Sequence, residues 1–107
     1  MLPSLKMDAD ESVQEAISAG KRHAERGDLP KAIKAFARAT MLVPAEQLVK
    51  CGDVNVMQSD YKTAFRCYRM AESQPKLREL HRHLKDSGYD ALAEEVSKSV
   101  VIMEKPS

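Results

Sequence analysis

Apolar residues recur at three- and four-residue steps along most of the chain, which is the spacing of one face of an α-helix. The first such stripe runs from Val13 to Ala24 and is followed by Gly27, a residue that tolerates the left-handed conformation common at helix ends. Ser12 and Glu15 have the spacing of a capping box. The first helix is therefore expected to start near Ser12 and to end before Gly27.

Further apolar stripes, separated by turn-forming residues, predict five more helices. Asp28 is expected to cap the second helix with Pro30 in its first turn, and the stripe from Ala32 to Leu42 is expected to end at Pro44. The remaining stripes cover about 48–55, 61–71, 77–84 and 92–103. Because the connections are short, consecutive helices should pair in opposite directions. The pattern predicts an all-α chain of six helices in three antiparallel pairs.

Two parts of the chain repeat each other, residues 27–44 and residues 59–75. The matching pairs lie 32 residues apart: Ala32 and Ala64, Phe36 and Tyr68, and Ala39 and Ala71. Gly20 and Gly52, which precede these segments, have the same separation. Two helices that cross closely need small residues at the crossing, and the glycines with the first pair of alanines supply them. The aromatic pair is predicted to fill the space between one helix pair and the next.

These residues and their spacing resemble the tetratricopeptide repeat, a helix–turn–helix unit with a usual period of 34 residues. The resemblance implies a right-handed solenoid in which stacked pairs bury a continuous core. The units would cover about 12–44, 45–75 and 76–104, the third being a degenerate repeat that caps the stack. Residues 11–104 would form a single domain, preceded by a flexible tail at 1–10, which mixes Pro, Ser and Asp without periodicity.

The first helix of each unit lines a concave groove in this family, so the resemblance also implies a set of partner-binding positions. By slot they are Ile17, Lys21, Val49, Lys50, Asp53, Val56, Met57, Arg78 and Arg82. A groove that mixes apolar and charged side chains suits an extended or helical peptide with apolar anchors. The expected function is a non-catalytic protein–protein interaction module, such as an adaptor, a scaffold or a chaperone-like protein.

Some family members bind acidic carboxyl-terminal tails of heat-shock chaperones through a clamp of Lys, Asn and Arg. The corresponding slots here hold Ile17, Lys21 and Lys50, and then approximately Pro75 and Glu79. Most of the converging donors are missing, and Glu79 would repel a carboxylate. Recognition of such a tail is therefore not expected.

Charge changes this interpretation little. The 107 residues contain 17 Lys and Arg against 16 Asp and Glu, a net charge of +1 that gives no general attraction to nucleic acid or to an anionic membrane. One local basic run is present, consisting of Lys76, Arg78, His81, Arg82, His83 and Lys85. Nucleic-acid or phosphate binding by the fifth helix is thus an alternative function, but no aromatic residue interleaves with these charges, and a solvated face is favoured.

Nothing in the sequence predicts catalysis, a cofactor or a metal. There is no Gly-rich phosphate loop and no Cys/His constellation, and His81 and His83 would point about 200° apart on a helix. Cys51 and Cys67 lie within apolar helical patterns, where two buried free thiols are favoured over a disulfide.

The partner is expected to be another protein, and no membrane association is predicted. The start of the chain lacks the apolar run of a signal peptide and no segment is long enough to span a bilayer, which together predict a cytoplasmic protein. A further alternative is self-association as a homodimer. Val100, Val101, Ile102 and Met103 form a continuous apolar run that one helical face cannot bury, so some of these side chains should face a partner.

Overall fold

Six helices and no strand make up the part of the chain that the computed structural model describes, which is the backbone of residues 2–104 and the side chains of residues 12–103. In chain order they are α1 (Leu2–Glu25), α2 (Leu29–Arg38), α3 (Ala45–Met57), α4 (Tyr61–Met70), α5 (Gln74–Asp86) and α6 (Asp90–Glu104). The predicted all-α class and the predicted number of helices are confirmed within these residues.

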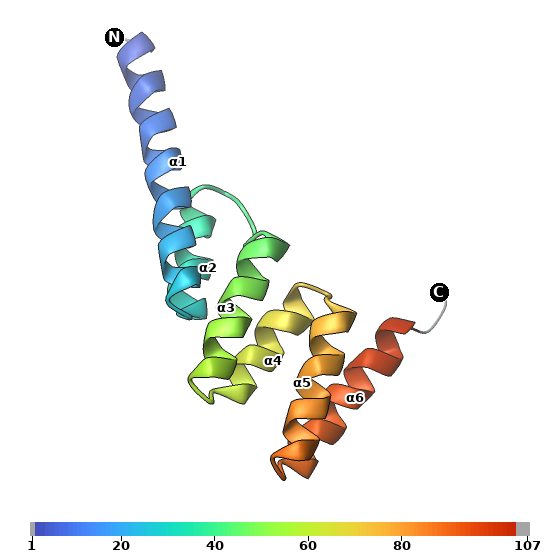
Figure 1. The fold of residues 1–107 in the computed structure, drawn as a ribbon. Coiled ribbons are helices and arrows are strands. Elements are labelled where there is room, and N and C mark those ends of the chain that lie inside the picture. Colours follow the sequence, from blue (N-terminus) through green and yellow to red (C-terminus); the bar gives the residue numbers. More distant parts are fainter. Residues whose placement is uncertain (1, 105–107) are drawn as a thin grey trace.

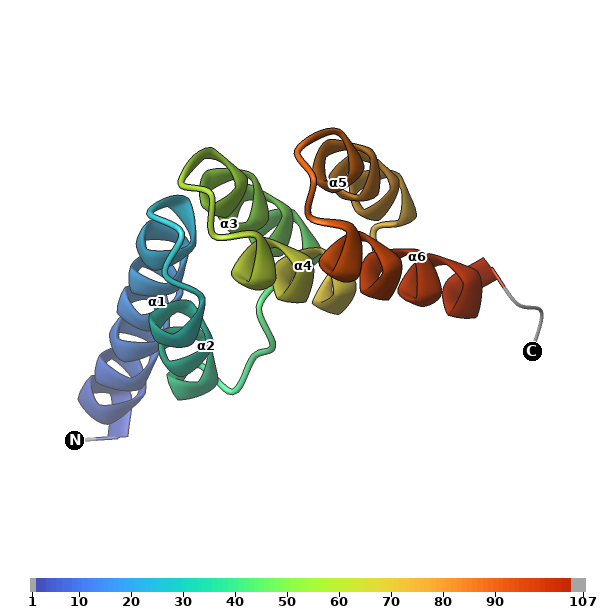
Figure 2. The same cartoon turned by 90° about the horizontal axis from the view of Figure 1, so that it is seen from below.

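Successive helices lie side by side as α1 with α2, α3 with α4, and α5 with α6 (Figure 1). Seen from below, α3 and α5 form one layer and α4 and α6 the other, while α1 and α2 are turned relative to them (Figure 2). Between the pairs, α1 contacts α3, and α4 contacts both α5 and α6. None of the helices within residues 2–104 is long and apolar enough to cross a membrane.

Three helices begin at a residue whose side chain caps them, including Asp28, which was predicted to do so. The Asp28 carboxylate accepts a hydrogen bond from the Lys31 backbone N–H at 3.1 Å, and the Asp60 carboxylate accepts one from the Thr63 backbone N–H at 3.2 Å. The Ser73 hydroxyl does the same for α5, accepting from the Lys76 backbone N–H. These side chains satisfy backbone donors that the first helical turn leaves without partners.

Five of the helices end in the same way. The residue after the cap has a positive φ angle, and the next backbone N–H reaches back to a carbonyl five residues earlier, as in a Schellman motif. The residues with positive φ are Gly27, Thr40, Ser59, Glu72 and Gly88. Every turn between helices is therefore built on one left-handed residue, even where that residue is not glycine.

Two predicted boundaries are wrong. The second helix ends at Arg38 rather than near Pro44, because Thr40 adopts φ 53° and turns the chain; Leu42 lies outside the helix and is 91% exposed instead of joining the stripe. The first helix does not start near Ser12. It begins at Leu2 and includes most of the segment predicted as a flexible tail, since residues 4–19 contain no glycine or proline that would end it. Met1 lies outside the described residues.

The buried side chains form two apolar clusters. The first joins α1, α2, α3 and α4 through Ala24, Leu29, Ala32, Phe36, Val43, Leu48, Cys51 and Cys67. The second joins α4, α5 and α6 through Ala64, Phe65, Tyr68, Leu77, Leu80, Leu84, Ala93, Val96 and Val100. Both cysteines are free and buried, as predicted, and a hydrogen bond to Cys51 together with burial raises the pKa of the Cys67 thiol.

Candidate functional site

Two pockets open where the first helices of successive pairs meet. We call the pocket between α1 and α3 the first junction; its volume is about 560 Å³. It is lined by Ile17, Lys21, Glu25, Phe36, Met41, Pro44, Glu46, Gln47 and Lys50. We call the pocket between α3 and α5 the second junction; its volume is about 260 Å³. It is lined by Asp53, Val56, Met57, Tyr68, Lys76, Glu79, Leu80 and His83.

Six of the nine predicted groove residues line these pockets. Ile17, Lys21 and Lys50 lie at the first junction, whereas Asp53, Val56 and Met57 lie at the second. Met57 is 83% exposed, which makes it the most accessible apolar side chain at either junction. The predicted residues therefore divide into two separate groups and do not form one continuous groove lining.

The other three predicted groove residues lie elsewhere. Val49 is half-buried and packs against the second apolar cluster, and Arg78 and Arg82 are exposed on α5 without lining either pocket. Their places on α5 are taken by Lys76, Glu79, Leu80 and His83, spaced as one helical face. Counting from the start of each helix could have located Lys76. It is the third residue after Ser73, the N-cap of α5, just as Gln47 at the first junction is the third residue after Pro44, the N-cap of α3.

Each junction contains a glycine that faces an aromatic ring. A Cβ atom on Gly20 would lie 2.5 Å from two ring carbons of Phe36, and one on Gly52 would lie 2.8 Å from Cδ1 of Tyr68 and nearer still to Cε1. The glycines were predicted, together with Ala32 and Ala64, to be the small residues at the helix crossings. The structure adds that each glycine makes room for an aromatic ring, because only a residue without a side chain lets a ring approach the helix backbone so closely.

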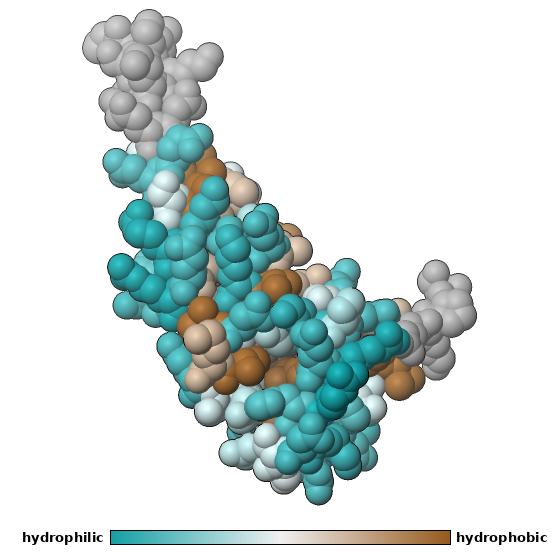
Figure 3. Space-filling model, viewed as in Figure 1, coloured by the Kyte–Doolittle hydropathy of each residue, from teal (hydrophilic) through white to brown (hydrophobic). Residues whose placement is uncertain are grey.

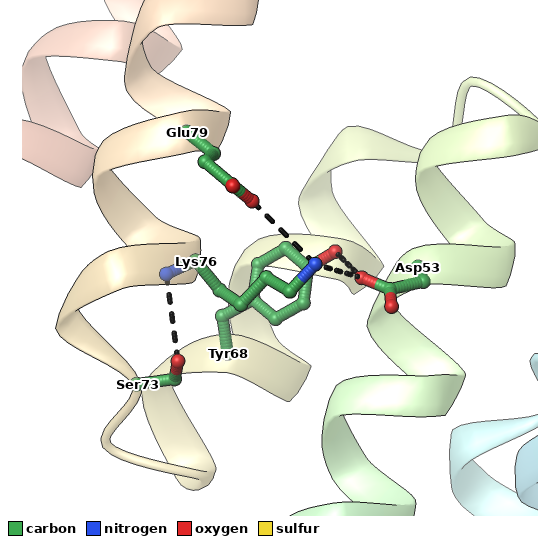
Figure 4. Close-up of polar contacts among 5 residues, drawn as sticks. All are labelled: Asp53, Tyr68, Ser73, Lys76 and Glu79. Atoms are coloured by element: carbon green, nitrogen blue, oxygen red, sulfur yellow. Dashed lines mark hydrogen bonds and ion pairs between the residues drawn. The ribbon is translucent and has the colours of Figure 1, made fainter.

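At the second junction the aromatic residue begins a polar network (Figure 4). The Tyr68 hydroxyl donates to Asp53 Oδ1 at 2.5 Å, and the same oxygen lies 3.2 Å from Lys76 Nζ. Lys76 Nζ is also 3.5 Å from Glu79 Oε2. Three helices, α3, α4 and α5, are thereby connected through one carboxylate and one ammonium group.

Two groups of this network, the Tyr68 hydroxyl and the Lys76 ammonium, have raised pKa values. Burial and the hydrogen bond to Asp53 raise the pKa of the Tyr68 hydroxyl, and the hydrogen bond with Asp53 raises the pKa of the Lys76 ammonium. Both groups keep their protons far above neutrality, so neither can act as a general base there. The chemistry of the network is structural, and its charges are satisfied within the chain.

The first junction has different residues at the equivalent places. Phe36 replaces Tyr68 and has no hydroxyl, Lys21 replaces Asp53, and Gln47 replaces Lys76. The Gln47 side chain is 93% buried, since only 7% of the residue is exposed, and its Oε1 atom has no hydrogen-bond partner among the described residues. Lys50 Nζ lies 3.7 Å from Glu46 Oε1 in an exposed pair. No network comparable to that of the second junction closes this pocket.

A separate contact joins the first unit to the second. The Asn55 side-chain amide donates to the carbonyl oxygen of Gly27 at 2.9 Å and to that of Cys51 at 2.8 Å. Asn55 is buried, and Gly27 holds the turn between α1 and α2 with φ 81°. This buried amide ties α3 to that turn and fixes the position of the first junction.

The remaining candidate sites lie on α5 and α6. In the basic run of α5, Lys76 pairs with Asp53 and Glu79, and Lys85 Nζ lies 3.7 Å from Asp90 Oδ1, which reduces the positive charge available to a ligand. His83 contacts the Tyr61 hydroxyl at 3.1 Å. Among the described residues no group of His, Cys, Asp or Glu could hold a metal ion.

The apolar run at the end of α6 divides between the core and the surface. Val100 is buried and Met103 packs against the second apolar cluster, but Val101 is 59% exposed and Ile102 is 72% exposed. The prediction that one helical face cannot bury the whole run is confirmed. Self-association through these side chains stays a prediction.

Comparison with known proteins adds no assignment. No protein-family model matches the chain, and neither a curated protein nor a solved structure matches it.

Proposed function

We propose that the chain is a tetratricopeptide-like right-handed solenoid of three antiparallel helix pairs that acts as a non-catalytic protein–protein interaction module. The repeated contact of a glycine with an aromatic ring, Gly20 with Phe36 and Gly52 with Tyr68, supports the repeat because both pairs share one spacing. The shape also supports it. The molecule measures 60 by 35 by 16 Å, and its radius of gyration of 16.8 Å exceeds the roughly 13 Å of a globular domain of this size.

The proposed function rests on two pockets that lie between the first helices of successive pairs, one between α1 and α3 and the other between α3 and α5. Their walls combine apolar side chains with charged ones, and the space-filling view shows apolar patches among hydrophilic side chains (Figure 3). An extended segment of another protein that crosses α3 could place one apolar side chain in each pocket. Such a module holds its partner and performs no chemistry on it.

The two pockets would contribute differently to binding. At the second junction Val56, Met57 and Leu80 offer apolar surface for an anchoring side chain. At the first junction Ile17 offers a smaller apolar surface, and Lys21 and the exposed Lys50 would fix the register of the partner through charge. Affinity would therefore come mainly from Met57 and its neighbours, and selectivity from the two lysines.

A protein partner is favoured over nucleic acid. Lys76 and Lys85 of the basic run are held by carboxylates of the same chain, whereas binding to a phosphate backbone needs several cations free to displace counterions.

We further propose a cytoplasmic location, since Cys51 and Cys67 are both free thiols within one buried cluster, as in proteins of reducing compartments.

Selection from a library of displayed peptides, followed by affinity measurement, would test the proposed function. The wild-type protein should select peptides with apolar anchors, and Met57→Glu and Lys21→Glu should each weaken their binding. Leu42→Ser is the matched control, because Leu42 is exposed and lines neither junction. Peptides that bind Met57→Glu and Lys21→Glu as well as wild type would show that the junctions are not the binding site.

A further inference from the structure

A third pocket, distinct from the two junctions, lies between α2 and α4. We call it the α2–α4 slot; it is lined by Ile33, Ala37, Met41, Leu42, Val43, Leu48 and Met70, all of them apolar. Its volume of about 310 Å³ lies at the lower end of the roughly 300–1,000 Å³ of ligand pockets. The slot is suited to one or two aliphatic side chains and offers no polar group that would orient a small polar ligand.

The slot leaves apolar side chains uncovered. Leu42 is 91% exposed, and Met41 and Met70 are also exposed. The positive φ of Thr40 ends α2 early, and the chain that follows borders the opening: Val43 packs into the first apolar cluster, whereas Met41 and Leu42 stay exposed. A contiguous exposed apolar surface of this kind marks an interaction site.

The helices beside the slot carry only positive charge. Neither α2 nor α4 contains an acidic residue, and each contains three basic ones. Lys34 lies three residues before Ala37, and Arg66 lies four residues before Met70, so both share a helix face with a lining residue. Neither has an ion-pair partner among the described side chains. The occupant of the slot should therefore be apolar with acidic side chains beside its apolar part.

The outer face of α6 has this composition. Val101 and Ile102 are its exposed apolar residues, and the apolar surface at this end of the chain is visible beside the carboxyl terminus in Figure 3. Glu94 and Glu95 are exposed seven residues earlier, two helical turns or about 10 Å along the same face. Glu94 Oε1 also lies 3.9 Å from Lys98 Nζ of the same helix, in an exposed pair of the kind that contributes little to stability. The inner face of α6, with Val96 and Val100, stays buried in its own chain.

We infer that α6 of one copy docks onto the α2–α4 slot of a second copy. Val101 and Ile102 enter the slot beside Leu42 and Met70, while Glu94 and Glu95 face Lys34 and Arg66. Neither chain has to unfold, because all the docking side chains are already exposed. Met41 lines both the slot and the first junction, but none of the side chains assigned to this contact lines either junction, so the self-association does not depend on the proposed peptide binding.

The slot and the outer face of α6 are different surfaces, and this determines what assemblies can form. A contact between two different surfaces closes if two copies exchange their α6 helices reciprocally, and otherwise it extends into longer oligomers. Both forms require the same side chains. The mass of the assembly distinguishes them and the contact itself is tested by substitution.

Sedimentation velocity over a wide range of protein concentration is the first test, with melting temperature as the check on folding. The wild-type chain should associate, and Leu42→Ser and Ile102→Ser should each weaken association about tenfold or more, because each removes an apolar side chain from the contact. Both residues are exposed, so the melting temperature of the monomer should not fall. Met57→Glu, at the second junction, is the control and should associate as wild type does.

Charge reversal is the second test, because it distinguishes this contact from non-specific association. Lys34→Glu with Arg66→Glu, or Glu94→Lys with Glu95→Lys, should weaken association, and combining all four changes in one chain should restore it. A wild-type chain that stays monomeric at every concentration overturns the inference. So does association that is lost with Ile102→Ser but kept with Leu42→Ser, which would mean that α6 pairs with another surface.

Discussion

The two junctions share one arrangement of helices but differ in the polar contacts around their aromatic rings. In both, a glycine of one helix faces an aromatic ring from the helix paired with it, and the next residue along the chain projects toward the following pair. At the second junction that next residue is Asp53, which receives the Tyr68 hydroxyl and Lys76. At the first it is Lys21, beside a phenylalanine and a glutamine whose oxygen has no partner.

This difference concerns how the polar groups of each junction are satisfied. The second junction pairs its charged groups within the chain and connects α3, α4 and α5, while Met57 stays exposed beside the network. The first junction leaves the Gln47 side-chain oxygen without a partner among the described residues, which costs stability. If the junctions bind a partner as proposed, the first has an unsatisfied acceptor to offer it and the second has mainly apolar surface.

The largest expected effect comes from adding a methyl group at the glycines. Gly20→Ala should destabilise by about 1–3 kcal/mol, because the new Cβ overpacks against Phe36 and the gain in helix propensity of about 1 kcal/mol offsets only part of this. Gly52→Ala should cost about 1 kcal/mol more, because the ring of Tyr68 cannot move away without losing its bond to Asp53. Urea denaturation of the two variants would measure the difference.

A double-mutant cycle provides the control. In a Tyr68→Phe background the ring is no longer held by its hydroxyl, so Gly52→Ala should cost about as much as Gly20→Ala does in the wild-type chain. Equal costs of the two glycine substitutions in the wild-type background would contradict the view that the polar network holds the ring in place.

Tyr68→Phe alone is the next largest effect. It converts the second junction toward the first by removing the hydroxyl while the ring stays buried. Hydrogen bonds to charged groups contribute about 1.5–3 kcal/mol, so a loss near the lower end of that range is expected, since Asp53 retains Lys76. The reverse change, Phe36→Tyr, should give no comparable gain because Lys21, and not a carboxylate, stands at the position equivalent to Asp53. A stabilising Phe36→Tyr would show that the junctions are more alike than their contacts indicate.

Sequence patterns located most of the helices because the interactions that begin and end a helix join residues that are close in sequence. Asp28 and Gly27 act within a few residues of their own position, and each does what was predicted. Two boundaries failed for reasons that lie outside such rules. Thr40 adopts a left-handed conformation that its β-branched side chain disfavours, and nothing between Pro3 and Gly20 ends the first helix.

The candidate site was predictable only as far as the repeat itself. Lys21, Asp53 and Met57 were assigned to a groove from the resemblance to the repeat family, and all three line a pocket. Arg78 and Arg82 were assigned on α5 from a degenerate unit, and the pocket contains Lys76 and Glu79 instead. A shift of a few residues on a helix changes the face presented, and only tertiary contacts show which face meets α3.

Smaller changes in stability are expected from substituting Gln47, the third residue of α3, and Lys76, the third residue of α5. The two changes should have opposite signs. Gln47→Leu removes a buried oxygen that has no partner and should stabilise the chain by about 1 kcal/mol. Lys76→Met removes ion pairs with Asp53 and Glu79 and should destabilise by roughly 0.5 kcal/mol, because these pairs are partly exposed. Thermal denaturation of both variants would measure the signs. A destabilised Gln47→Leu would mean that the glutamine is satisfied in the free protein.

The last prediction is that no binding occurs: a peptide with an acidic carboxyl terminus should not bind at the junctions. Carboxylate recognition depends on several donors converging on one buried group. Here Lys50 is paired with Glu46, Lys76 is held between Asp53 and Glu79, and the remaining cation of the first junction, Lys21, shares its pocket with Glu25. Backbone amide shifts recorded while such a peptide is titrated provide the measurement. Saturable shifts centred on Lys21 and Lys50 would show that the first junction accepts a carboxylate, whereas shifts produced only by peptides with apolar anchors would assign recognition to the surface around Met57.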